Sequence, residues 1–181
     1  MKLRLFALLL CLPFAATATA KEIELPDSCG DANTKFEVTT QKSTAPLPTP
    51  DAGKALIVFI QPYDSLCRGC ILRFAMDGQW VGATKKDGSY FTLQVEPGQH
   101  HFCATDRIPN TIAIRSFEVK GNTTYFLQAR VIGAGARTEE ENDSQVIPTG
   151  KRTLYFGMSL LDVEKGRYLI KSYEVAEFKK K

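Results

Sequence analysis

The stretch ALIVFI, residues 55–60, decides the fold. It is an unbroken apolar run rich in branched side chains, whereas a strand with one face in water alternates apolar and polar residues. A short run of this composition predicts a strand that is buried on both faces. We therefore expect residues 55–60 to lie in the centre of a sheet.

More β-like segments surround this run at short spacing. They are Lys35–Thr40 upstream and, downstream, Ile71–Met76, Gln79–Thr84, Ser89–Val95, Gln99–Thr105, Ile112–Val119, Thr123–Val131 and Thr153–Val163. Asp77-Gly78 predicts a two-residue hairpin, and Pro97-Gly98 and Gly121-Asn122 predict further turns. Two hairpins in succession between residues 71 and 105 suggest a meander.

This pattern predicts an all-β fold. The most favoured arrangement is an antiparallel β-sandwich of about seven to nine strands, and a closed barrel is the alternative. Residues 164–178 fit both helical and strand spacing, and we expect a short helix followed by an extended tail. The predicted organisation is a signal peptide at 1–20, an N-terminal arm and Pro-rich linker at 21–53, the sandwich at 54–178 and a basic tail at 179–181.

The first twenty residues have the layout of a secretory signal peptide. Lys2 and Arg4 precede an apolar run at 5–16, and Ala18-Thr19-Ala20 follows it. The run is too short for a transmembrane helix, which needs about 20 residues. We expect cleavage near Ala20 and a secreted or periplasmic protein without a transmembrane segment. A lipid-modified Cys11 is less favoured, because a lipobox has a small residue before the cysteine and here that residue is Leu10.

The composition is that of one ordinary soluble domain. The 181 residues are 44% hydrophobic and 24% charged, with a net charge of +3. Residues 1–20 include Lys2 and Arg4 and no acidic residue, so their removal would leave 161 residues and a net charge of +1. Such a small charge provides almost no field for a phosphate backbone, and we expect no nucleic-acid partner.

Four cysteines would remain after cleavage: Cys29, Cys67, Cys70 and Cys103. An even number in an exported chain predicts disulfides, with three possible pairings. A Cys29–Cys103 bond would attach the N-terminal arm to a strand. By closing a loop of about 75 residues it would contribute roughly 4 to 5 kcal/mol, against about 2 for a Cys67–Cys70 bond.

The Cys67-Arg68-Gly69-Cys70 pattern also admits two chemical roles. In thiol–disulfide enzymes such a pair begins a helix, whose N-terminus lowers the thiol pKa. Here β-like segments lie on both sides, so we favour a structural bond and keep a redox protein as the alternative function. A zinc site of these two cysteines with His101 and Cys103 is less favoured, because oxidation competes for the thiols. His100 is expected on the surface.

No catalytic motif is present. The chain lacks a P-loop, a nucleophile-elbow serine and a complete dinucleotide loop, and it has two histidines in all. We therefore expect no catalytic residue, no metal and no cofactor. The remaining binding candidates are Trp80, as part of an exposed aromatic patch, and Arg137, Glu139 and Glu140 in the long segment 133–152. For Trp80, a packing role in the core or a hairpin is the favoured alternative.

Several segments together resemble a known bacterial family. They are Lys54–Ile60, MDGQWVGA at 76–83, GSYF at 88–91, VEPGQH at 95–100 and GNTTYF at 121–126. They are similar to the exported family called domain of unknown function 2846, and to PEGA-type and carboxypeptidase-regulatory-like β-sandwiches. The Ser28-Cys29-Gly30 segment and the strand around Cys103 resemble disulfide-bearing members from acidobacteria-like bacteria. The resemblance implies a fold and export, and it carries over no catalytic residue.

Together these observations predict a secreted or periplasmic, non-catalytic β-sandwich. We expect it to serve as a binding or structural module of the cell envelope, with an envelope component or another protein as its partner. The envelope role depends on analogy between folds, and no residue in the sequence identifies the ligand.

Overall fold

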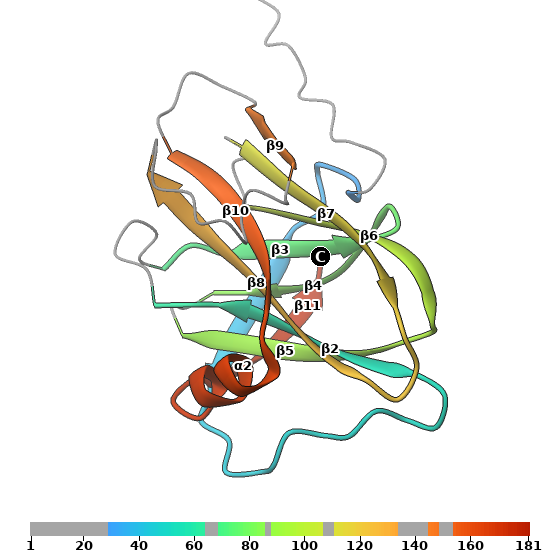
Figure 1. Cartoon of the computed structure of the whole chain (residues 1–181). Helices are drawn as coiled ribbons and strands as arrows, with labels where there is room; N and C mark the ends of the chain where they lie inside the picture. Colours follow the sequence, from blue (N-terminus) through green and yellow to red (C-terminus); the bar gives the residue numbers. More distant parts are fainter. Residues whose placement is uncertain (1–28, 64–68, 86–87, 107–110, 134–144, 149–153) are drawn as a thin grey trace, which may run out of the picture.

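The computed structural model of the chain describes residues 29–63, 69–85, 88–106, 111–133, 145–148 and 154–181 (Figure 1). These residues form two packed sheets. The six-stranded sheet contains, in spatial order, β1 (Phe36–Gln41), β11 (Glu174–Lys180), β5 (Ser89–Val95), β2 (Ala55–Gln61), β8 (Thr124–Gly133) and β10 (Leu154–Leu161). The five-stranded sheet contains β4 (Gln79–Thr84), β3 (Leu72–Met76), β6 (Gly98–Asp106), β7 (Thr111–Val119) and β9 (Gln145–Pro148). The all-β sandwich fold is confirmed.

Strand β2 occupies the inner position that its sequence predicts. It lies between β5 and β8, and each of its residues is buried. Ala55, Ile57 and Phe59 point into the core between the two sheets, where Phe59 stacks on Phe91 at 4.8 Å between ring centroids. The alternating residues belong to a second cluster on the outer face of the sheet. The unbroken apolar run therefore reflects two separate cores.

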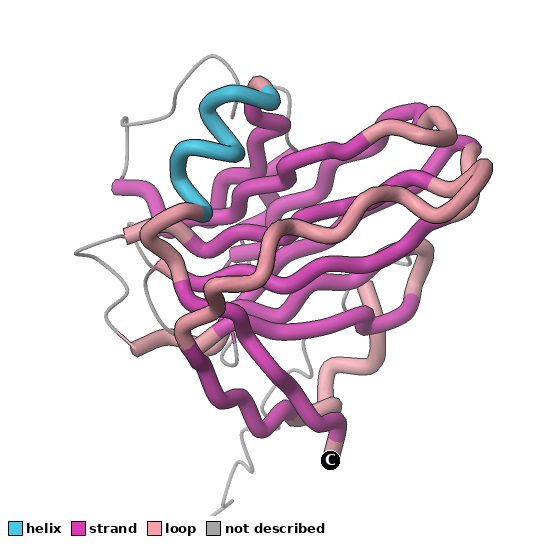
Figure 2. The backbone as a smooth tube through the Cα atoms, turned by 90° about the horizontal axis from the view of Figure 1, so that it is seen from below, coloured by secondary structure: helices cyan, strands magenta, loops and turns pink. Residues whose placement is uncertain are grey.

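The outer face of the six-stranded sheet is covered by a helix and by the linker. Helix α2 spans Val163–Ile170, and Figure 2 shows it in cyan on one side of the strands. Leu169 and Ile170 of the helix and Leu47 of the linker pack against the outer cluster, which includes the outer residues of β2. The predicted C-terminal helix is confirmed. No helix in the described parts of the chain is long and apolar enough to cross a membrane.

The outer face of the five-stranded sheet is covered by residues 29–34. Cys29 is bonded to Cys103 of β6, with 5.3 Å between their Cα atoms. The bonded pair packs with Trp80 of β4 and with Ala75 and Ile112. The N-terminal arm is thus attached covalently to the sheet, in one of the three pairings that the sequence left open.

Arg73 lies beneath this arm and is only 2% exposed. Its guanidinium donates to the carbonyls of Ala32 and Thr34 in the arm and of Asp106 in β6, at 3.0 to 3.2 Å. It also lies over the indole ring of Trp80, 4.5 Å from the centroid. Burial lowers the pKa of Arg73, which the nearby Asp106 and Asp31 partly offset. The arginine therefore joins the arm to the sheet through hydrogen bonds that no apolar side chain could make.

The structure differs from the predicted domain boundaries at both ends. The strand expected in the arm, β1, pairs antiparallel with β11 over six residues and belongs to the six-stranded sheet. Lys179 and Lys180 are part of β11, so the basic residues continue a strand where we expected a separate tail. The two ends of the sandwich therefore pair with each other, which is a long-range contact that local patterns do not encode.

The predicted meander is wrong. The hairpin at Asp77-Gly78 does form, and both residues have the positive φ that a type I′ turn requires, 50° and 80°. By contrast, β5 and β6 lie in different sheets, as do β7 and β8, so the turns at Pro97-Gly98 and Gly121-Asn122 are crossings between sheets. The pairs β2–β8 and β5–β11 are parallel, so the sandwich is not purely antiparallel.

We expect replacement of the arm's disulfide to lower stability strongly. The Cys29→Ala/Cys103→Ala variant should lose about 3 to 5 kcal/mol of unfolding free energy in urea, because the bond closes a loop of 74 residues. Reductant should lower the stability of the parent chain more than that of this variant. In the variant, reductant can act only on the bond of Cys70, so its response measures the contribution of that bond alone. An equal response of both proteins to reductant would show that the bond contributes little.

We also expect Arg73→Met to be destabilising by about 2 to 4 kcal/mol, because three carbonyl groups would lose their buried donor. The matched control is Arg167→Met on the exposed face of α2, which should change stability by less than about 0.5 kcal/mol. Urea unfolding measures both. Similar values for the two variants would contradict the role given to Arg73.

Candidate functional site

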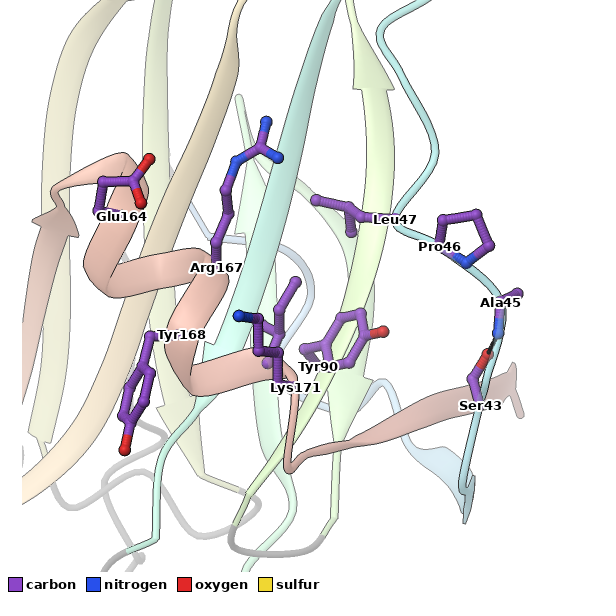
Figure 3. A pocket seen from close by; sticks show the side chains of 10 residues that line it. Ser43, Ala45, Pro46, Leu47, Tyr90, Glu164, Arg167, Tyr168 and Lys171 are labelled. Atoms are coloured by element: carbon purple, nitrogen blue, oxygen red, sulfur yellow. Dashed lines mark hydrogen bonds between the residues drawn. The ribbon is translucent and has the colours of Figure 1, made fainter.

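An open groove of about 460 Å³ lies between the linker and helix α2 (Figure 3). Its volume is within the range of small-molecule sites. It is lined by Ser43, Ala45, Pro46, Leu47, Tyr90, Glu164, Arg167, Tyr168, Ile170 and Lys171. The two walls come from segments more than 100 residues apart in the chain, and the sheet supplies the floor.

The first wall is the Pro-rich linker, which the sheet holds in place. Pro46, Pro48 and Pro50 favour an extended backbone without internal hydrogen bonds. The side chain of Gln94 in β5 binds this backbone twice, accepting from the N–H of Asp51 at 3.1 Å and donating to the carbonyl of Thr49 at 3.0 Å. The wall is therefore fixed at its far end as well as by the packing of Leu47.

The second wall is helix α2. A side chain caps its N-terminus, and a close contact with the sheet sets its position. The carboxylate of Asp162 accepts from the backbone N–H groups of Glu164 and Lys165, which caps the helix. Gly166 faces the ring of Phe126 so closely that a Cβ there would collide with it. The close approach fixes the rotation of the helix, so that Arg167 and Lys171 lie beside the linker (Figure 3).

Two cations line the groove without a partner. Arg167 and Lys171 are exposed, and neither side chain forms a hydrogen bond or an ion pair within the described ranges. Glu164 also lines the groove, and no ion pair joins it to either cation. Residues four apart on a helix are neighbours, so the two like charges disfavour each other slightly. The net charge of the lining residues is +1.

Tyr90 contributes to the floor. Its ring packs in the outer cluster and the residue is 8% exposed, while its hydroxyl points toward the linker in Figure 3. Burial raises the pKa of this hydroxyl, so it stays a neutral hydrogen-bonding group at physiological pH. Tyr168 on the helix is 74% exposed and is directed away from Tyr90. The groove thus combines an apolar floor, one hydroxyl and two positive charges.

The predicted cysteine sites have mixed outcomes. Cys103 is bonded to Cys29 and buried, so the zinc site that included it with His101 is not formed. Cys70 is disulfide-bonded and lies two residues before the start of strand β3, and Cys67 lies outside the described residues. The redox alternative for this pair stays a prediction. Among the residues that the structure describes, no three of His, Cys, Asp and Glu are placed to hold a metal ion.

The predicted binding residues are not found together at the surface. Trp80 is buried, and its indole N–H donates to the carbonyl of Asp31 at 2.7 Å. A Cβ at Gly30 would collide with its ring. Trp80 is thus a packing residue under the arm, and the idea of an exposed aromatic patch there is corrected. Arg137, Glu139 and Glu140 lie outside the described residues.

Both histidines take part in a polar cluster that the sequence analysis missed. The Nδ1 atom of His100 lies 2.6 Å from the Asp77 carboxylate, and its Nε2 lies 2.9 Å from the carbonyl of Glu96. The ring is therefore held in place, although we expected a plain surface residue. The other Asp77 oxygen accepts from the backbone N–H of His101, whose Nδ1 lies 2.6 Å from Oγ of Ser116.

This cluster is arranged for structure and not for nucleophilic catalysis. Ser116 and His101 form a pair, but in a catalytic triad a carboxylate orients the imidazole that contacts the serine. Here the carboxylate of Asp77 contacts the ring of His100 and only the backbone of His101. The cluster fastens the β3–β4 turn to β6, and it leaves the groove as the strongest candidate site.

The sequence held a partial signal for the groove. The spacing of Arg167 and Lys171 would have placed them on one helical face, and the prolines marked the linker as extended. Their meeting could not be foreseen, because it depends on how both segments cover the same sheet.

Comparisons with known proteins returned no match. No family model, no curated protein and no solved structure is similar to this chain at a significant level.

The Asp77 cluster predicts a change of stability at acid pH. Burial alone would raise the pKa of Asp77, but the hydrogen bonds from the His100 ring and the His101 N–H, together with both histidine charges, lower it. The resulting stability is present above the unfolded pKa of about 4 and is lost as the pH falls through the lower folded pKa. Because the pair is exposed, we expect less than about 1 kcal/mol.

Urea unfolding between pH 6 and pH 2.5 measures this contribution. The difference in stability between the parent chain and Asp77→Asn should shrink as the pH falls, since the asparagine keeps the turn and lacks the charge. A difference that does not change with pH would contradict the assignment.

Proposed function

We propose that this chain is an exported, non-catalytic binding module of the cell envelope, and that the groove between residues 43–47 and α2 is its binding surface. The layout of residues 1–20 supports export. The Cys29–Cys103 bond and the bonded state of Cys70 support an oxidising location, since cytosolic thiols are kept reduced. The resemblance to exported β-sandwich families is consistent with the same location.

One observation carries the proposal: both walls of the groove are held by contacts with the sheet, yet the side chains of Arg167 and Lys171 and the hydroxyl of Tyr90 have no hydrogen-bond partner among the described residues. The linker is held by Gln94 just beyond the groove, at Thr49 and Asp51, and by the packing of Leu47, while the helix is held by the contact of Gly166 with Phe126. Little ordering of the backbone would therefore be needed when a ligand binds. Beneath the arm, by contrast, Arg73 and Trp80 have their donors engaged by protein carbonyls. Two positive charges and a tyrosine hydroxyl kept at a preformed concave surface favour binding of a ligand.

The cysteine pair offers a second role with less support. Thiol–disulfide enzymes use a helix N-terminus to lower the pKa of the attacking thiol. Cys70 instead precedes a strand, and the helix that the structure describes lies at the other end of the chain. We therefore propose a structural role for the bond of Cys70. A measured reduction potential below about −300 mV would agree with that role, and a potential near those of oxidoreductases would contradict it.

Fragment mapping by NMR tests the location of the site without knowledge of the ligand. Phenol, benzamide, benzoate and glucose are added separately to the full chain with its disulfides intact. We expect the amide shifts of at least the aromatic fragments to cluster at residues 43–47, 90 and 164–171, because binding surfaces capture small probes preferentially. Ala45→Trp, which would fill the groove, should lower the affinity measured from these shifts at least tenfold.

The matched control is Ala52→Trp, an exposed position of the same linker that does not line the groove. It should leave the shifts unchanged. Shifts concentrated on another face of the sandwich, or scattered without a preferred site, would contradict the proposal.

A further inference from the structure

We infer that the ligand of the groove is an amphiphilic anion, with a carboxylate or phosphate group attached to an apolar or ring-shaped body. This inference rests on the proposed binding role and adds the chemical class of the ligand. It is drawn from the charge, spacing and surroundings of Arg167 and Lys171.

The charges select the anionic group. Most exposed cations on a protein gain little from their neighbours. These two lie four residues apart, Arg167 in the last turn of α2 and Lys171 as its C-cap in helical conformation, and their side chains lack an acidic partner in the ranges described. Glu164 cannot neutralise both, and no ion pair links it to either. A carboxylate or phosphate between them would remove the like-charge repulsion. The planar guanidinium can bind either group through two parallel hydrogen bonds.

The apolar side chains of the two walls select the rest of the ligand. Leu47 and Ile170 are only partly buried, and together with Pro46 they present apolar surface directly beside the two cations. A free inorganic anion would leave this surface in water. An apolar or ring-shaped body would cover it, and the hydroxyl of Tyr90 would supply one hydrogen bond (Figure 3). The volume of about 460 Å³ suits a body of one or two rings or a short chain.

The rigid walls make the charge pattern selective. Arg167 and Lys171 can adjust through their long side chains, but the backbone on both sides is held by Gln94 and by the contact of Gly166 with Phe126. The backbone positions that carry the two cations and the apolar side chains of the walls are therefore set before binding. Such a site discriminates ligands by the placement of one charge next to an apolar body, and a neutral ligand of the same shape gains no charge pairing.

The test compares isosteric ligands of different charge. Benzoate and benzamide have the same shape, and phenyl phosphate carries the alternative anion. We expect benzoate or phenyl phosphate to bind at least tenfold more tightly than benzamide in NMR titrations at low salt, with shifts at residues 43–47 and 164–171. The stronger of the two anions identifies a carboxylate or a phosphate as the natural group. Inorganic phosphate alone should bind more weakly than phenyl phosphate.

The variant Arg167→Gln/Lys171→Gln should remove the preference for anions and keep the weak binding of benzamide. Because both side chains are exposed, we expect its thermal stability to change only slightly: the loss of like-charge repulsion is opposed by the loss of the favourable interaction of both cations with the helix C-terminus. The control Lys165→Gln/Lys179→Gln removes two charges outside the groove and should keep the preference.

Two failures are distinguishable. Equal affinity of the groove for benzoate, phenyl phosphate and benzamide would overturn the inference about charge and leave the proposed site standing. Absence of groove shifts with every ligand would overturn both the inference and the proposed function. Equal loss of the preference in both double variants would show a general charge effect and would also overturn the inference.

Discussion

The structure depends on the need to cover β2 on both faces. Its residues alternate between the core inside the sandwich and a second cluster outside it, so a sandwich of two sheets alone would leave half of its apolar side chains in water. Each buried aliphatic side chain contributes on the order of 1.5 to 3 kcal/mol, and the fold requires an additional layer to keep that contribution. Helix α2 and the Pro-rich linker form this layer, and the groove is the space between them.

The two outer layers are held by different means. On the five-stranded sheet, the arm is attached by the Cys29–Cys103 bond and by hydrogen bonds from Arg73 to the carbonyls of Ala32 and Thr34. On the six-stranded sheet, α2 and the linker are held by apolar packing, a helix cap and Gln94. The charged side chains of Arg167 and Lys171 remain exposed in the groove between them. The first layer is closed and supports the fold, whereas the second presents an open surface.

Local patterns predicted the elements of this fold better than their connections. The apolar run at 55–60, the hairpin at Asp77-Gly78 and the short helix near residue 164 all follow from side-chain type and spacing. The crossings at Pro97-Gly98 and Gly121-Asn122 could not be predicted in this way. A turn residue specifies a change of direction, but it does not specify which sheet the next strand joins. The pairing of β1 with β11 joins residues about 140 positions apart, and no local signal marks it.

The candidate site was beyond sequence reasoning for a related reason. Catalytic motifs are visible in a sequence when one segment carries several reactive groups, but the groove combines ordinary residues from the linker, β5 and α2. Trp80, the one tryptophan, drew attention in the sequence as a binding candidate. In the structure its large ring packs under the N-terminal arm. Arg167 and Lys171 look like common surface charges until the structure shows that the linker lies beside them and that no described carboxylate neutralises them. Their significance therefore comes from what the fold leaves unpaired next to an apolar floor.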